Sequence, residues 1–174
     1  QNIYLLANNL KEAMFDVDNI DIAAKYISKQ KGFSIIGSGI NYALAREAAL
    51  KIKETSYINT NSCPMGEFVH GHFALLNKTK TFLTFLSEEN KENEDKLLYK
   101  ILNTYKKAKS IIISDSFEDY GCEILVKVPK MTSKIATLLI MIITLQLIAF
   151  KSAIFLKRNV DKPKGLNKIV QNKG

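Results

Sequence analysis

The sequence predicts an α/β fold, a three-layer α/β/α sandwich in which helices cover both faces of a parallel sheet. Short apolar runs such as 81–86 (TFLTFL) and 110–114 (SIIIS) alternate with longer segments of helical spacing. These runs are apolar almost throughout, which is typical of strands buried on both faces of a parallel sheet. With 174 residues, 47% of them hydrophobic, the chain is long enough to form one domain with its own core.

The elements are predicted in chain order from the same patterns. Strands are expected at 33–36, 81–86, 110–114 and 123–128. Helices are expected at 41–57, 92–109 and 134–157, the last with Ser133 as its N-cap. Residues 3–29 are expected to form two helices separated near Asp16 and Asp18, and a loop with Cys63, Pro64 and Gly66 leads into a short segment at 67–76. We treat 1–174 as a single domain with a leading helical segment (1–30) and a polar, basic tail (159–174).

The formal net charge of +8 raises the question of a nucleic-acid partner. Nearly all of the positive charge comes from lysine, and Arg46 and Arg158 are the only arginines. Recognition of bases and phosphates depends heavily on arginine, whose planar fork binds them in a bidentate manner. The lysines are also scattered, except near 106–109 and in the tail. We therefore expect a solvated surface and no nucleic-acid partner.

The contents of cysteine and histidine are low. Cys63 and Cys122 are far apart in sequence, which indicates no disulfide framework and fits the reducing cytoplasm. His70 and His72 are the only histidines and leave little material for a metal site. We expect no metal and no cofactor.

No membrane span is expected. The most apolar stretch, 135–150, is shorter than the ~20 residues that a bilayer requires, and it is predicted to be a buried core or interface helix. Residues 1–30 lack a basic segment followed by an apolar block, so no signal peptide is expected. The chain opens at Gln1 rather than Met, which is compatible with a piece of a longer protein.

The first candidate binding feature is the glycine turn Gly37-Ser38-Gly39, which directly follows the first predicted strand. In open parallel sheets ligands bind at the carboxyl ends of the strands, and glycines let a ligand approach the backbone. The N–H groups that open the next helix favour anions or sugar oxygens. A tight turn without any ligand explains the same residues equally well.

Three charged residues share one face of the predicted helix 41–57. Glu47, Lys51 and Glu54 are spaced i, i+4, i+7 among small and apolar residues, so this helix is expected to be largely buried with its charges converging in one place. A carboxylate held near a lysine in a cleft is a candidate proton shuttle. The alternative is a surface Glu–Lys–Glu ladder. His70 can likewise move protons near neutral pH, or be a loop histidine without a catalytic role.

The run GSGINYALAREAALKIKETSYINTNSCPMGEFVHGHFALL, at 37–76, resembles the SIS (sugar isomerase) domain. It is most similar to the C-terminal SIS domain of the isomerising glucosamine-6-phosphate synthase family, which carries ExALKLKE, SYI and GExxHGxxAL in this order. LQLIAF (145–150) and NVDKPKGLNKIV (159–170) are similar to the family's LQLLAY helix and VDxPxxLxKxV tail. The resemblance extends from about Phe33 to Val170.

This resemblance implies a flavodoxin-like fold, action on a phosphorylated sugar or amino sugar, and a homodimer. By position, Glu54 matches the family's base for proton transfer between C1 and C2. His70 matches a histidine that helps to open the sugar ring in a neighbouring subunit's site, and Lys168 matches the tail lysine that contacts the open-chain carbonyl and can form a Schiff base. Glu47 and Lys51 match supporting residues, and the tail would fold over the site as a lid.

Some family features are missing or changed. The Ser-rich phosphate loop of the family's first SIS domain has no counterpart, because the segment after the second predicted strand, 87–90 (SEEN), is acidic. The glutaminase domain is also missing, so glutamine-driven synthesis is not expected of this chain. His72 replaces a usual proline and Asn59 a common histidine, whereas Phe68 and Phe73 are more typical of related deglycases and deaminases.

Three functions remain open. The first is the C-terminal half of a two-SIS-domain isomerase or deaminase that acts on amino-sugar or ketose 6-phosphates. The second is a fructosamine-6-phosphate deglycase, which would share Glu54 and His70 but depend less on Lys168. The third is a non-catalytic module that senses sugar phosphates; the lack of a helix-turn-helix segment and the presence of all three residues count against it.

Overall fold

The computed structural model describes residues 16–72, 74, 76, 80–88, 91–116, 118–131 and 133–163. Five parallel strands form one sheet in the order β2-β1-β3-β4-β5. Their bounds are β1 Gly32–Gly37, β2 Asn59–Pro64, β3 Thr81–Leu86, β4 Lys109–Ser114 and β5 Ile124–Lys127. The predicted α/β class with a parallel sheet is therefore confirmed.

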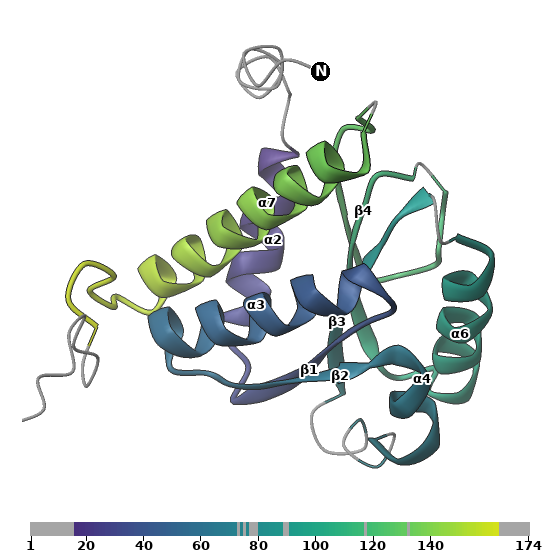
Figure 1. The fold of residues 1–174 in the computed structure, drawn as a ribbon. Helices are drawn as coiled ribbons and strands as arrows, with labels where there is room; N and C mark the ends of the chain where they lie inside the picture. The colour runs from purple at the N-terminus through teal and green to yellow at the C-terminus, as the bar shows by residue number, and fades with distance from the viewer. Residues whose placement is uncertain are drawn as a thin grey trace, which may run out of the picture.

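Helices cover both faces of this sheet and complete the three predicted layers (Figure 1). One face carries α2 (Val17–Ile27), α3 (Ile40–Ser56) and α7 (Lys134–Phe155). The other carries the single turn α4 (Met65–Glu67), the π-helical turn η1 (Phe68–His72) and α6 (Lys91–Thr104). The strand order is that of flavodoxin-like sheets.

The continuous apolar strands supply two separate cores. In β3, Leu83 and Phe85 face α2, α3 and α7, whereas Phe82 and Leu86 face α4 and α6. Successive side chains of a strand point to opposite faces, so a strand covered on both sides is apolar at every position. All six residues of β3 are buried.

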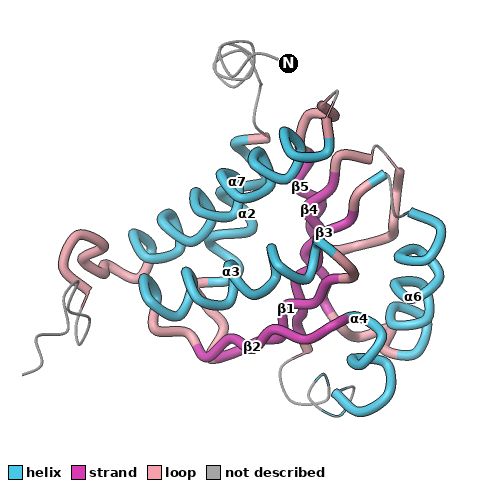
Figure 2. The backbone as a smooth tube through the Cα atoms, viewed as in Figure 1, coloured by secondary structure: helices cyan, strands magenta, loops and turns pink. Residues whose placement is uncertain are grey.

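The prediction of four strands was wrong, because β2 occupies part of the segment predicted as a loop. Its residues, NTNSCP, pair only with β1, and β2 forms one edge of the sheet (Figure 2). Burial follows a partial alternation in which Thr60 and Cys63 face inward while Asn59 and Asn61 are exposed. A polar edge strand of this kind lacks the apolar run by which the other four were found.

Helix boundaries agree with the predictions at most ends. Ser133 caps α7, its side chain accepting a hydrogen bond from the Ala136 N–H at 3.2 Å, and Asp16 caps α2 in the same way. The predicted helix before Asp16 lies outside the described residues. Helix α6 ends at Thr104, five residues earlier than predicted, since the chain must turn back to begin β4 at Lys109 beside Thr81.

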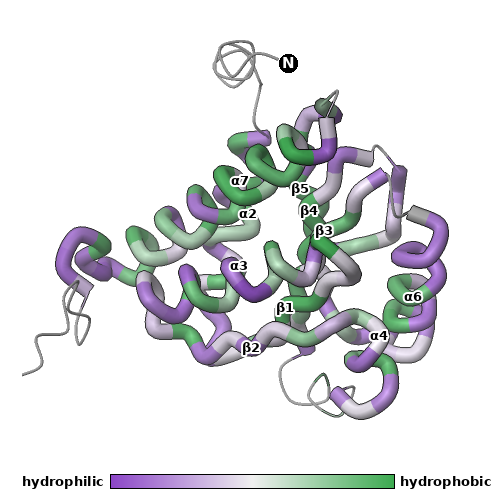
Figure 3. The backbone as a smooth tube through the Cα atoms, viewed as in Figure 1, coloured by the Kyte–Doolittle hydropathy of each residue, from purple (hydrophilic) through white to green (hydrophobic). Residues whose placement is uncertain are grey.

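Helix α7 has 22 residues and is long and apolar enough to cross a membrane by length and composition alone. The helix is longer than the apolar stretch 135–150 on which the expectation of no membrane span rested. The helix is hydrophobic along most of its length (Figure 3), yet it packs on α2 and α3, and ten of its residues are buried in this contact layer. It has the packing of a core helix. Ile135, Ile154 and Phe155 remain exposed on its outer side.

The strand order reverses between β1 and β3. From β1 the chain passes through α3 to β2 on one side, and from β2 it crosses through α4 and η1 to β3 on the other side of β1. The carboxyl ends of β1 and β3 consequently face the start of α3. Such a switch point is where ligands commonly bind in open α/β sheets.

Candidate functional site

The charged face of α3 is present as the spacing predicted. Lys51 Nζ lies 3.0 Å from Glu54 Oε2 and 3.7 Å from Glu47 Oε1. Each of the three side chains is about one-third exposed, at 33% for Lys51, 30% for Glu54 and 36% for Glu47. The hydrogen bond from Lys51 to Glu54 raises the pKa of Lys51, so its ammonium stays charged beside the carboxylate. Ion pairs of this kind contribute only about 0.2–0.5 kcal/mol to a helix.

The outer face of α3 is more open than predicted. Leu44, Ala48 and Ile52 are buried against the sheet, but Ala43 and Leu50 are exposed, Leu50 to 46%. The expectation that the helix is largely buried holds for its inner face only. Leu50 lies three residues after Glu47 and four before Glu54, so it borders the charged face of the helix. An exposed apolar side chain therefore lies beside the two carboxylates.

The glycine turn lies at the other end of α3. Gly37 ends β1 and Gly39 is the N-cap residue of α3, whereas Glu54 is in its last turn. Fifteen residues of helix separate Gly39 from Glu54, which corresponds to about 22 Å. The predicted substrate-binding turn and the predicted base therefore do not belong to one site within this chain.

The backbone structure of this turn requires glycine at positions 37 and 39, whether or not a ligand binds there. A Cβ on Gly37 would lie 2.4 Å from the carbonyl oxygen of Asn41, so the first turn of α3 can pack here only against glycine. Gly39 has φ 52° and ψ −125°, a conformation that residues with a side chain rarely adopt. Ser38 is half-buried, and its carbonyl oxygen accepts a hydrogen bond from the Asn41 N–H.

His70 lies beyond the carboxyl end of β2. It belongs to η1 and is exposed, while its neighbour Phe68 is fully buried against Phe82. Because Glu54 precedes β2 and His70 follows it, the six residues of this strand, about 17 Å in length, separate the two. The π-helical turn leaves His70 exposed to solvent.

The root of the C-terminal tail lies beside the last turn of α3. The Arg158 guanidinium is 5.1 Å from the ring centroid of Tyr57, and the Thr55 hydroxyl donates to the Ala149 carbonyl oxygen at 3.4 Å. Figure 1 shows the ends of α3 and α7 together, with the tail beginning there in yellow. Lys168 lies outside the described residues, so its predicted contact stays a prediction.

A buried polar cluster at the switch point was not predicted. Asn41 Nδ2 donates to Glu94 Oε1 at 3.0 Å and to Ser87 Oγ at 3.2 Å, and the Ser87 N–H donates to Glu94 Oε2 at 3.3 Å. Glu94 is 1% exposed. Burial raises its pKa to about 7, although the hydrogen bonds from Ser87 and Asn41 oppose the shift. In the sequence Glu94 resembles an ordinary acidic residue of a first helical turn, and only the topology brings it to Asn41.

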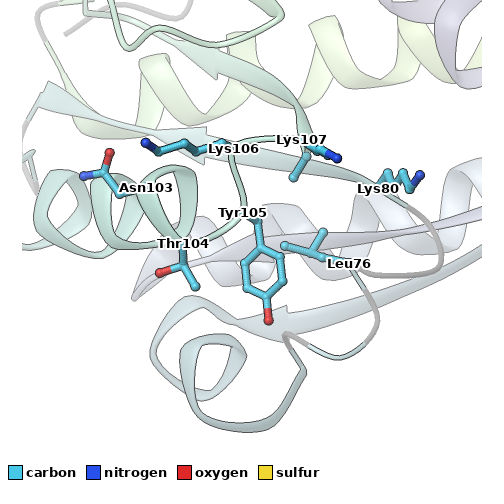
Figure 4. A pocket seen from close by; sticks show the side chains of 8 residues that line it. Leu76, Lys80, Asn103, Thr104, Tyr105, Lys106 and Lys107 are labelled. Atoms are coloured by element: carbon cyan, nitrogen blue, oxygen red, sulfur yellow. The ribbon is translucent and has the colours of Figure 1, made fainter.

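A cavity of about 520 Å³ lies at the amino edge of the sheet, between Leu76, Lys80 and the turn after α6. It contains none of the predicted site residues. Figure 4 shows the amino groups of Lys106 and Lys107 pointing in opposite directions, so they do not converge on one ligand position. The cavity is on the α6 face, whereas Glu54 is on the opposite face. Its position gives no support to a sugar site.

Within the described ranges, no three His, Cys, Asp or Glu side chains come close enough together to hold a metal ion. Cys63 and Cys122 are free thiols. Burial raises the pKa of both, that of Cys122 to about 11, so neither is activated as a thiolate nucleophile.

The comparison with known families decides the relationship. The model of the SIS domain family matches residues 26–154, which run from α2 almost to the end of α7. The chain belongs to the SIS domain family. This membership agrees with the resemblance of the motifs and with the sheet order described above.

The relatives of this SIS domain are longer proteins. The glutamine–fructose-6-phosphate aminotransferase (isomerizing) of Clostridium tetani is 33% identical over 176 aligned residues, which cover 92% of this chain and 28% of that protein. The chain spans little more than a quarter of the length of the curated relatives it matches.

Solved structures share the fold. The C-terminal domain of glucosamine-fructose-6-phosphate aminotransferase from Francisella tularensis superposes with a TM-score of 0.69 at 26% identity, over 83% of this chain and 41% of that one. The sugar isomerase domain of an RpiR transcription factor from Sphaerobacter thermophilus gives a TM-score of 0.70 at 14% identity, over 87% and 85% of the chains. The fold is therefore common to an aminotransferase domain and to a regulator.

Proposed function

We propose that this SIS domain acts on amino-sugar or ketose 6-phosphates by aldose–ketose proton transfer, with Glu54 as the base. The observation that carries the proposal is the Glu54 carboxylate held 3.0 Å from the Lys51 ammonium on an accessible helix face. Its relatives are isomerising aminotransferases, and the motif ExALKLKE is matched at 47–54. We propose a cytoplasmic location.

The chemistry requires one carboxylate near C1 and C2 of the open-chain sugar. Glu54 takes a proton from C1 of the ketose, the electron pair of that C–H bond forms the C1–C2 double bond, and the π pair of the C2 carbonyl moves to its oxygen. That oxygen takes up the proton that the C1 hydroxyl releases; the carbonyl re-forms at C1 as the C1–C2 π pair takes the proton from Glu54 at C2, which gives the aldose. Such general base catalysis contributes about 10²–10⁴-fold to a rate. Lys51 fixes the orientation of the carboxylate, and Glu47 holds Lys51 from the preceding turn.

A complete site needs groups from outside one copy of the domain. His70 of the same chain lies beyond the far end of β2, so the ring-opening histidine comes from a partner subunit in a homodimer. The exposed apolar side chains of α3 and α7, among them Leu50, Ile154 and Phe155, support such a contact. The match to 41% of the solved C-terminal domain of an aminotransferase supports one half of a two-SIS-domain protein.

The tail supplies the third group in this proposal. Its root at Arg158 is beside the end of α3, and the ten residues from Arg158 to Lys168 can span up to about 35 Å. Lys168 is therefore within reach of a sugar held at Glu54. As an amine near the carbonyl carbon it can form an imine with loss of water, which acidifies the neighbouring C–H.

The two alternatives receive less support. Phe68, which favoured a deglycase in the motif comparison, is fully buried against Phe82 and therefore has a packing role. The sensor alternative shares the fold, as the RpiR domain does, but needs no paired Glu54 and Lys51.

The deciding experiment is proton NMR of fructose 6-phosphate and glucosamine 6-phosphate in D₂O. We expect deuterium to enter C1 or C2 with the chain as it stands, and the Glu54→Gln variant to exchange about 10²–10⁴-fold more slowly. Glu92→Gln is the matched control, because Glu92 forms an exposed ion pair with Lys96 on α6, which covers the opposite face of the sheet from α3 and Glu54. The same assay is run on the longest natural polypeptide that contains this chain. If neither this chain nor the longer polypeptide exchanged deuterium, the isomerase would be excluded, and the deglycase and the sensing module would remain.

A further inference from the structure

We infer that Glu94 is a proton-dependent latch that joins the first turn of α6 to the carboxyl edge of the sheet at its switch point. The inference concerns the described residues of this chain alone and does not rest on the proposed function. It starts from a buried carboxyl group that the proposed chemistry leaves unused.

The latch joins three elements that are far apart in sequence. The Glu94 carboxyl, in the first turn of α6, accepts hydrogen bonds from the side chain of Asn41 in α3 and from the backbone N–H of Ser87 after β3. Asn41 also donates to the Ser87 hydroxyl at 3.2 Å. One carboxyl therefore connects the helix after β1, the end of β3 and the helix after β3.

Because the Glu94 carboxyl is buried, a negative charge on it would destabilise the latched state. Asn41 is 0% exposed and Glu94 1%, so water does not screen the carboxylate. Within the described ranges no lysine, arginine or histidine forms an ion pair with Glu94. A buried charge without an ionic partner is costly, and the favourable state of such a group is the neutral one.

The neighbouring titratable groups, like burial, raise the pKa of Glu94. Asp95, on the same helix, and Asp115, after β4, both disfavour a negative charge at Glu94. Asp115 accepts the N–H of Glu88 at 2.9 Å, so a second carboxylate holds the residue next to Ser87. Asn41, from α3, contributes an amide and no charge. The charges that act on Glu94 are therefore those of carboxyl groups, and Glu94 itself has no cationic ion-pair partner among the described residues.

The effect of pH on the latch follows from the different pKa of Glu94 in its latched and opened states. In the latched state the Glu94 pKa is about 7, and in an opened, hydrated state it returns toward its ordinary value of 4.5. The latched state therefore binds more protons between these values, and its stability falls as the pH rises from 4.5 to 7. The constant for local opening is expected to rise on the order of a hundredfold between pH 5 and pH 8.

Amide hydrogen exchange at Ser87, corrected for the intrinsic pH dependence of exchange, measures this opening directly. In the unmodified chain we expect protection to fall on the order of a hundredfold from pH 5 to pH 8, and the Ser87 ¹H–¹⁵N shift to titrate with a midpoint near 7. Glu94→Gln keeps the shape and the acceptor oxygen but cannot ionise, and we expect both changes to disappear. Glu92→Gln, two residues earlier and exposed, should retain them.

A second variant keeps the inference testable if Glu94→Gln does not fold. Asp95→Asn removes one neighbouring negative charge, which should move the Ser87 midpoint to lower pH. Protection that is independent of pH in the unmodified chain would overturn the latch. So would an unchanged pH dependence in Glu94→Gln, or an unchanged midpoint in Asp95→Asn. None of these readouts requires a sugar, so they are separate from the exchange assay in D₂O.

Discussion

Glu54 and His70 lie beyond opposite ends of the edge strand β2. Glu54 is in the last turn of α3, before the strand begins, and His70 is in the π-helical turn that follows it. Both are accessible from outside the domain. If both act on one sugar, they must therefore come from two copies or two domains.

Mixed dimers test this geometry. Glu54→Gln and His70→Ala should each be inactive alone, whereas their co-expression should restore about a quarter of the unmodified activity, because half of the dimers are mixed and one of their two shared sites is intact. The measurement is C1–C2 deuterium exchange of the co-purified mixture. A mixture as inactive as its components would show that Glu54 and His70 do not share a site between subunits.

Much of the fold could be predicted because β1, β3 and β4 are buried at nearly every position and, like β5, contain short apolar runs. The i, i+4, i+7 spacing of Glu47, Lys51 and Glu54 likewise predicted one helix face, which the short distances between them confirm. The capping role of Ser133 was also predictable from its side chain and position. Local signals of this kind act over a few residues, so a single sequence contains them.

Other features depend on packing between distant segments. Strand β2 is polar and lies at the edge of the sheet, and only its pairing with β1 identifies it as a strand. The contact of Asn41 with Glu94 joins residues 53 positions apart, and no local pattern indicates it. The separation of Gly39 from Glu54, by contrast, follows from the length of the predicted helix, since each residue adds about 1.5 Å.

Gly37 is predicted to be required for packing. Gly37→Ala should lower the free energy of unfolding by roughly 2–3 kcal/mol or more, because the new methyl group would meet the Asn41 carbonyl of α3. Gly66→Ala is the control, since no atom lies within 4 Å of its Cβ position. Urea denaturation of both variants makes the comparison. Equal stability of the two would mean that α3 can shift away from β1 at little cost.

Lys51 is predicted to affect activity more than stability. Lys51→Met removes the ammonium that fixes Glu54 and should slow C1–C2 exchange on the order of tenfold to a hundredfold. The free energy of unfolding should change by only about 0.5 kcal/mol, since these ion pairs are partly exposed. Lys53→Met, an exposed neighbour on the same helix, is the control for each measurement. An exchange rate as high as that of the control would remove Lys51 from the site.

Tyr57 is predicted to hold the root of the tail. The Arg158 guanidinium lies 5.1 Å from its ring centroid, and contacts of this kind at exposed positions contribute about 0.5–1 kcal/mol. Tyr57→Leu should therefore increase trypsin cleavage after Arg158 about two- to fivefold, whereas Tyr57→Phe keeps the ring and should leave the rate near that of the unmodified chain. Because Tyr57 is only three residues after Glu54, C1–C2 deuterium exchange is a second readout for the same variants. If the tail delivers Lys168 to the sugar, deuterium exchange should fall in Tyr57→Leu and recover in Tyr57→Phe. Faster cleavage with unchanged exchange would separate the anchoring of the tail from catalysis, and equal cleavage in both variants would contradict the anchor itself.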